Sequence, residues 1–200
     1  MTTLNVQTRD LKTKAKRLRR EGFVTGNVFG KQIEGSIPVQ IAKKEAERIH
    51  KECLKGSQLY LNVDGKTYDV LLKEVDYDAM SHTILEMDFQ ALVKGEKVHS
   101  TAEIVLHNKD KVQGGVLEQL LTEISYKALP EKLIDKVEVD CSNLHVGDIL
   151  KVSDLDIVKD EDIEIMTHMD TTVVTVFVPK NAEVEDSETA EPEVVGDKKE

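Results

Sequence analysis

Short runs of alternating apolar and polar residues, separated by turn residues, are the feature that most restricts how this 200-residue chain can fold. The clearest case is residues 59–72, where two alternating runs flank the Asp64-Gly65 pair. An Asp-Gly pair between alternating runs is typical of a two-residue β-hairpin turn. Because side chains of a strand alternate between its two faces, this pattern favours half-buried strands over helices. The sequence therefore predicts a mostly β protein.

The same reasoning predicts the other elements. In the first 92 residues we expect strands at 23–29, 37–41 and 84–89 and helices at 11–21 and 42–54. After residue 98, strand-like runs recur about every ten residues, which is typical of an all-β domain. These runs cover residues 102–106, 124–128, 137–141, 149–152 and 173–178.

The length is enough for one large domain or for two domains of about 100 residues. The linker-like sequence Lys94-Gly95-Glu96-Lys97 favours two. We expect a mostly antiparallel domain over residues 1–92, an all-β domain over 93–179 and a disordered acidic tail over 180–200, which has too few apolar residues to order itself. No stretch is apolar enough to be a membrane span or a secretory signal, so a soluble, cytoplasmic protein is expected.

Charge is distributed unevenly along the chain, whose net charge is −11. Residues 1–56 hold 13 Lys and Arg against 6 Asp and Glu, and residues 57–92 hold 2 against 7. The remaining 108 residues carry 12 basic against 25 acidic side chains. An asymmetry of this kind indicates that the two halves meet different partners.

The basic charge is concentrated just after the N-terminus. Seven of the twelve residues from 9 to 20 are cationic, namely Arg9, Lys12, Lys14, Lys16, Arg17, Arg19 and Arg20. On a helix over residues 11–21, Leu11, Ala15 and Leu18 would form one narrow apolar stripe, and the cations would occupy the rest of the surface. Such a run can be a solvated helix face. However, like charges at this density repel one another, so an anionic polymer is the better interpretation.

The sequence carries no constellation typical of an enzyme, a nucleotide site or a metal site. The glycines between residues 22 and 30 do not have the spacing of a dinucleotide or phosphate loop, and the six histidines form no metal-binding pair. Cys53 and Cys141 have no partner at ligand spacing, and the acidic stretch 154–164 lacks the ligand pattern of a calcium loop. We expect no catalytic residue, no cofactor and no metal.

Several stretches carry a family resemblance. They are Lys12 to Gly30 (KTKAKRLRREGFVTGNVFG), Val63 to Lys66 with Glu74-Val75, Met87-Asp88-Phe89, Gly114 to Glu118, Val137 to Asp140, Gly147-Asp148 and Val152 to Leu155. Together they resemble the bacterial large-subunit ribosomal protein L25 family, whose longer members are called general stress protein Ctc. The resemblance extends over about residues 4–179.

This resemblance implies a β-barrel-like N-terminal domain with a few helices, which binds 5S ribosomal RNA, and an all-β C-terminal domain. It also implies a non-catalytic component of the large subunit, with other large-subunit proteins as partners and with neither a membrane nor a small-molecule substrate. The RNA-binding residues that it indicates are Arg9, Lys12, Lys14, Lys16, Arg17, Arg19, Arg20, Phe29 and Asp88.

Three positions depart from the family pattern. Thr25 stands where a proline is usual, Glu86 where a histidine is common, and Asp78-Ala79 where an Asp-Pro step usually occurs. Two other functions stay open. One is a module for a different structured RNA, because the anticodon-binding domains of glutaminyl-tRNA synthetase resemble this fold. The other is a stress-related interaction protein that meets the ribosome only transiently.

Overall fold

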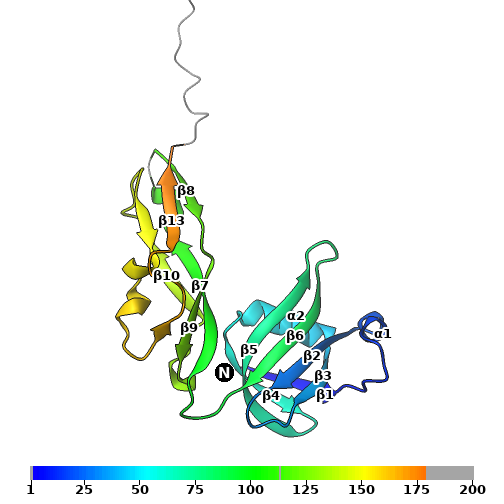
Figure 1. Ribbon diagram of the computed structural model, residues 1–200. Helices are drawn as coiled ribbons and strands as arrows, with labels where there is room; N and C mark the ends of the chain where they lie inside the picture. The colour runs from blue at the N-terminus through cyan, green and yellow to red at the C-terminus, as the bar shows by residue number, and fades with distance from the viewer. Residues whose placement is uncertain (1, 113, 179–200) are drawn as a thin grey trace, which may run out of the picture.

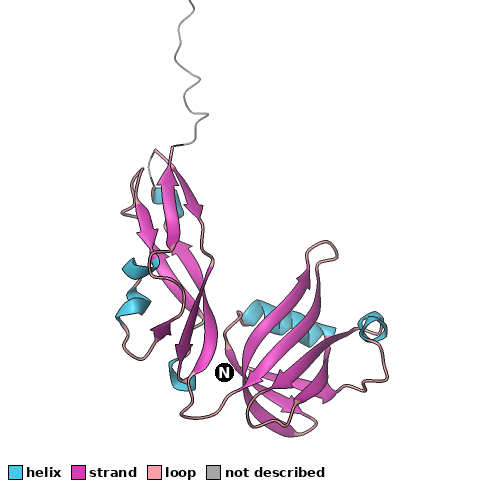
Figure 2. Cartoon of the chain, viewed as in Figure 1, coloured by secondary structure: helices cyan, strands magenta, loops and turns pink. Residues whose placement is uncertain are grey.

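The computed structural model describes residues 2–112 and 114–178, which form two β-rich units (Figure 1). The first unit contains β1 (Thr3–Thr8), α1 (Ala15–Arg20), β2 (Phe23–Phe29), β3 (Ser36–Ala42), α2 (Lys43–Glu52), β4 (Gln58–Val63), β5 (Lys66–Asp78) and β6 (Thr83–Ala91). The second contains β7 (Val98–His107), β8 (Val116–Gln119), β9 (Glu123–Ala128), β10 (Lys136–Asp140), β11 (Ile149–Lys151), β12 (Glu164–Ile165) and β13 (Thr172–Phe177). Short 3₁₀ turns lie at Lys109–Lys111, Pro130–Lys132, Val152–Asp154 and Asp156–Lys159. Strands dominate both units (Figure 2), which confirms the predicted mostly β fold class.

The first unit is a closed barrel with the strand order β1-β3-β2-β6-β5-β4. Two parallel pairings, β1 with β4 and β2 with β6, complete the ring, and the remaining neighbours are antiparallel. The β4–β5 hairpin turns at Asp64 and Gly65, both at positive φ, as the sequence predicts. Closure leaves no free sheet edge in the barrel.

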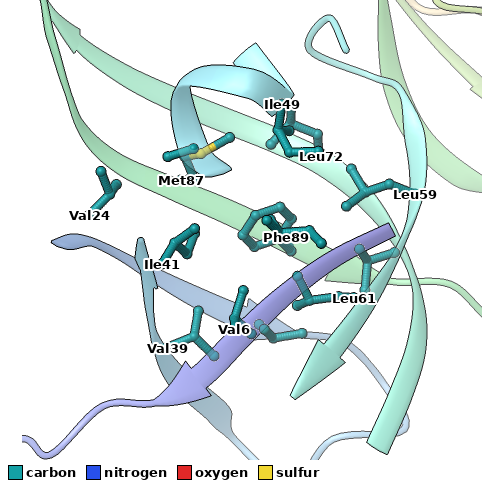
Figure 3. Packing of buried hydrophobic residues seen from close by; sticks show 14 of the residues in the cluster. Val6, Val24, Val39, Ile41, Ile49, Leu59, Leu61, Leu72, Met87 and Phe89 are labelled. Carbon is teal, nitrogen blue, oxygen red and sulfur yellow. The ribbon is translucent and has the colours of Figure 1, made fainter. Parts of the chain in front are cut away.

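The barrel interior is filled by side chains from all six strands and from α2. Figure 3 shows the Phe89 ring among side chains of the neighbouring strands, with Ile49 of α2 close by. Both residues are fully buried, and Ala46 on the same face of α2 is also buried. The helical spacing of these apolar residues in the sequence is therefore explained, since α2 covers the barrel core.

The barrel depends on one close approach of two backbones. A Cβ atom on Gly26 of β2 would lie 2.1 Å from the carbonyl oxygen of Met87 on β6. No side chain fits in that space, so only glycine allows these parallel strands to pair at this position. Gly26 thereby allows the register in which Asn27 of β2 lies opposite Asp88 of β6.

The second unit packs a four-stranded sheet, β10-β7-β9-β12, beside a three-stranded sheet, β11-β13-β8. Their shared core includes the fully buried Tyr126, Ile124 and Val174. The five predicted strands of this unit are confirmed within a few residues at each end. The short strands β8 and β12 were not predicted, and neither was β1 of the barrel.

The predicted helix over residues 11–21 is wrong at its N-terminal end. Asp10 holds a turn instead, because its carboxylate accepts a hydrogen bond from the Lys12 amide (2.9 Å) and its carbonyl accepts one from the Thr13 amide (3.0 Å). The helix begins only at Ala15, and Leu11 is 74% exposed. The apolar stripe therefore reduces to Leu18, which is 5% exposed, with a half-buried Ala15 beside it.

The two units meet at a small joint with an apolar centre. Leu71 and Leu92 from the barrel pack against Val98 and Leu133 from the second unit. Around this cluster the Lys73 ammonium donates to the His99 carbonyl (2.9 Å). Burial at this contact lowers the pKa of Lys73. The joint therefore combines apolar packing with a polar contact that is partly shielded from water.

Gly56, in the turn before β4, lies against the backbone of β7 at the same joint. Its φ is +92°, and a Cβ there would lie 2.0 Å from the Thr101 carbonyl oxygen. An ion pair between Lys55 and Glu123 (3.1 Å) lies beside it. Any side chain at position 56 would push the two units apart.

The predicted disordered tail at 180–200 lies outside the described residues, and the domain boundaries at 92 and 179 stay a proposal. In the part of the chain that the structure describes, no helix is long and apolar enough to cross a membrane.

Candidate RNA interface

The short helix α1 presents most of its surface outward. Leu18 is its one buried residue, and the helix packs on β2. Lys16, Arg17 and Arg20 are exposed on the remaining surface. Because the helix docks through a single apolar side chain, a second contact is needed to fix its orientation.

Arg19 supplies that contact. Its Nε donates to the Leu85 carbonyl on β6 (3.1 Å), and its Nη2 donates to the Thr25 hydroxyl on β2 (3.4 Å). Thr25 is 1% exposed, so this guanidinium is held against the barrel wall. The departure at Thr25 from the family pattern thus has a structural role here, because a proline would offer no hydroxyl. Arg19 thus holds the helix against the barrel, and its predicted place near phosphate stays a prediction.

Five of the six remaining predicted cations fall into two groups. Lys12, Lys14, Lys16 and Arg20 are exposed, and among the described residues none of them takes part in an ion pair. Arg17 pairs with Glu21 at 2.8 Å, which raises the pKa of Arg17. A pair this exposed is worth little in water. The Arg17 guanidinium can therefore be transferred to a phosphate at small cost.

Arg9 lies at the end of β1, where the turn that leads to α1 begins. Its amide donates to the Pro38 carbonyl (2.9 Å), and its Nη2 donates to the Thr13 carbonyl (3.2 Å). Its Nε is buried and has no protein partner. The Arg9 side chain therefore supports the turn that presents Lys12 and Lys14.

The outward faces of β5 and β6 are acidic, and β6 pairs with β2, the strand on which α1 packs. Glu86 lies directly opposite Asp76, and Asp88 lies directly opposite Glu74. These four carboxylates line a hollow of about 200 Å³. We call these four residues the carboxylate rows. Like charges directly opposite each other destabilise a sheet, so this arrangement costs stability.

Asn27 of β2 organises the carboxylate rows. Its side-chain amide donates to Glu86 (3.2 Å) and to Asp88 (3.2 Å), and its backbone amide also donates to Asp88 (3.1 Å). Asp88 is thus oriented by β2, and its predicted contact with a base edge or a neighbouring group stays a prediction. Sequence reasoning missed Asn27, Glu74 and Asp76, because only the strand register places them beside Asp88.

Phe29 lies apart from the seven predicted cations between residues 9 and 20, which we call the basic cluster. It ends β2, six residues beyond Phe23, which is a distance of about 20 Å along a strand. It is half-buried and lies opposite Gln90, on the side of the barrel that leads to the joint. The structure therefore places the seven cations on α1 and the segment before it, Asp88 on β6 opposite Asn27, and Phe29 at the far end of β2.

The β5–β6 hairpin carries an exposed aromatic cluster that the sequence did not indicate. The Tyr77 ring stacks on His50 of α2 with ring centres 5.6 Å apart, and its hydroxyl lies 3.2 Å from His82 Nδ1.

Across the described residues, no group of three or more His, Cys, Asp or Glu side chains is arranged to hold a metal ion. The surface offers charge and hydrogen bonds to a partner.

Comparisons with known proteins follow the same division of the chain. The model of the ribosomal L25p family matches residues 4–89, and that of the ribosomal protein TL5 C-terminal domain matches residues 97–180. A protein of Listeria monocytogenes serotype 4b, named large ribosomal subunit protein bL25, is 33% identical over 204 aligned residues, which cover 100% of this chain and 97% of that protein. A protein of the same name from Thermosipho africanus is 34% identical, and the alignment covers 92% of this chain and 89% of that protein. Another, from Thermoanaerobacter sp. strain X514, is 29% identical, and the alignment covers 87% of each.

Proposed function

This chain belongs to the ribosomal L25p family, and from that premise we propose that it is a non-catalytic component of the large ribosomal subunit in the cytoplasm, whose barrel binds 5S ribosomal RNA. The observation that carries the proposal is the basic cluster on α1 and the turn before it. Five of its cations are exposed, while Leu18 and Arg19 fix the backbone that bears them. Cations on a fixed backbone can meet the phosphates of a folded RNA without first being ordered.

The residues divide by role. Lys12, Lys14, Lys16, Arg17 and Arg20 neutralise phosphates, whereas Arg19 positions the helix and Arg9 supports the turn. These contacts set where the barrel sits on the RNA, but they do not read sequence.

The carboxylate rows supply the selective part of the surface. An ionised carboxylate only accepts hydrogen bonds, and it repels phosphate. Asp88, held by Asn27, is therefore suited to the amino group of guanine in the wide minor groove of an RNA helix. An RNA that runs along β2 would reach Phe29 at its far end. The surface favours an RNA that presents amino groups, and no phosphate, opposite β6.

Titration of the full-length chain with 5S ribosomal RNA over a range of salt concentrations tests the proposal. Each neutralised phosphate adds about 0.7 to 0.9 to the slope of log affinity against log salt. The double variant Lys16→Gln with Arg20→Gln is therefore expected to lower that slope by about 1.4 to 1.8. Lys109→Gln with Lys111→Gln is the matched control, since both lysines are exposed in the second unit.

Three outcomes would contradict the proposal. One is equal affinity for 5S ribosomal RNA, transfer RNA and random duplex, which would favour a general module for structured RNA. Another is the same slope for the α1 variant and the control. The third is absence of the chain from large subunits sedimented at moderate salt, from stressed and unstressed cells alike, which would favour a transient interaction protein.

A further inference from the structure

The solvent-facing side of one sheet in the second unit carries several large apolar side chains. In the sheet β11-β13-β8, Val116 lies opposite Phe177, and Ile149 lies opposite Thr175. Directly opposite residues share a face, and alternate residues of a strand return to it. Leu120 extends β8 on this face, because its backbone N–H donates a hydrogen bond to the Val173 carbonyl (2.9 Å). We call Val116, Leu120, Ile149 and Phe177 the apolar face.

These four side chains are open to solvent. Val116 is 47% exposed, Leu120 56%, Ile149 57% and Phe177 41%. The alternate residues, such as Leu117, Leu150 and Val174, point into the core of the unit. Figure 1 shows β8 and β13 side by side, on the part of this unit that lies away from the barrel.

The outward face of the other sheet shows that this composition is not forced by the fold. Along β7, β9 and β10 the exposed positions are polar or charged, for example His99, Glu103, Glu123 and Glu138. Alternation of polar outside and apolar inside is usual for sheets with one solvated face. A group of exposed apolar side chains on one sheet alone marks an interaction surface.

Charge selects the partner that fits the apolar face. Residues 98–178 contain 7 Lys and Arg against 16 Asp and Glu. The face itself contains Glu118, opposite Thr175 and between Val116 and Leu120. RNA and a second copy of this unit are both anionic, so both would be repelled. The remaining segment, 179–200, is acidic as well, with 3 basic and 8 acidic residues.

We propose that the apolar face docks on a basic protein of the large ribosomal subunit, through apolar side chains of that protein that are surrounded by lysine and arginine. This inference rests on the function proposed above. The apolar contacts supply the binding energy, and the acidic surroundings steer and select the cationic partner. The chain thus joins an RNA at one end to a protein at the other.

The test uses the full-length chain and large subunits from which the endogenous protein has been removed. Ile149→Ser with Phe177→Ser is expected to weaken binding to these subunits about tenfold, which corresponds to about 1.4 kcal/mol. Affinity for free 5S ribosomal RNA is expected to stay unchanged. Val105→Ser, at a half-buried outward position of β7, is the matched control and is expected to affect neither measurement. Thermal unfolding of each variant shows whether the fold is retained.

A photo-crosslinker identifies the occupant. We place p-benzoylphenylalanine at position 177 and, as a control, at the exposed position 138 on β10. Position 177 is expected to link to a basic protein of the purified subunit, and position 138 is not. Links from 177 to ribosomal RNA, to a second copy or to residues 179–200 of the same chain would overturn the inference. If the Ile149→Ser, Phe177→Ser variant is folded and binds subunits as tightly as the wild type, the inference is also overturned, provided that the wild-type chain binds 5S ribosomal RNA. If wild-type chain binds neither RNA nor subunits, the proposed function fails first.

Discussion

Replacing Gly56 by alanine tests whether the joint holds the two units in one orientation. At φ +92° a Cβ atom costs about 1 to 2 kcal/mol of backbone strain in any surroundings. In addition, the Thr101 carbonyl oxygen would have to retreat from 2.0 Å to an ordinary contact of about 3.4 Å, a movement of about 1.4 Å. That movement displaces β7, which carries the His99 carbonyl bound by Lys73.

Gly65 offers a control with the same backbone conformation. Its φ is +91°, and nothing lies within 4 Å of the position of its Cβ. Gly65→Ala therefore carries the strain without the steric contact. We expect Gly56→Ala to lower the free energy of unfolding by about 1 to 3 kcal/mol more than Gly65→Ala does, the usual cost of overpacking.

Urea unfolding and NMR relaxation measure the two consequences. Relaxation should show one common tumbling time for both units in the wild type and in Gly65→Ala, and two shorter ones in Gly56→Ala. Equal stability losses for the two variants, with common tumbling preserved in both, would refute the idea that the joint is closed by contact at Gly56.

Three further perturbations follow from the described contacts. The pKa of Asp64 is lowered by hydrogen bonds from the Thr8 hydroxyl (2.5 Å) and amide (3.1 Å). These bonds therefore stabilise the folded chain above the ordinary pKa of 3.8, and this stabilisation is lost as the pH falls through the lowered value. Asp64→Asn should therefore destabilise the chain in urea at pH 7, and the loss should shrink as the pH falls below 3.8, so an equal loss across that range would contradict this. Tyr126→Phe should cost about 1 to 3 kcal/mol in the same assay, because the buried hydroxyl bonds both the amide and the carbonyl of Ile134 (2.8 Å each), and a neutral effect would show that these groups find other partners. Glu86→Gln should raise the melting temperature and the affinity for 5S ribosomal RNA, because it removes one charge from an opposed pair, and weaker RNA binding would show that this carboxylate contacts the RNA directly.

Local patterns predicted local structure well. The hairpin at Asp64-Gly65 and the helix α2 depend on residues close in sequence, so alternation and helical spacing were enough to find them. β1 was missed because only Leu4 and Val6 point inward, and its parallel partner β4 lies more than fifty residues away. α1 was predicted too long, because the turn at Asp10 competes with the first helical turn.

The candidate interface divides in the same way. The density of cations between residues 9 and 20 is visible in the sequence, whereas the function of any single one is not. Arg19 is distinguished from its neighbours by its bonds to the Thr25 hydroxyl and to the Leu85 carbonyl, which is 66 residues away. The carboxylate rows likewise exist only because β5 pairs with β6 in one register. Long-range pairing therefore decides which cations are offered to a partner.

The pairing of β2 with β6 also determines when, during synthesis, this surface can exist. Phe23–Phe29 leaves the ribosome early, but its parallel partner Thr83–Ala91 is translated some sixty residues later. Pairings this distant in sequence close late, because the loop between them must be ordered first. The basic segment of a nascent chain therefore remains an unanchored polycation until the last strand of the barrel emerges. Selective RNA recognition is then coupled to completion of the whole first unit, and truncated chains would bear the charge without the shape.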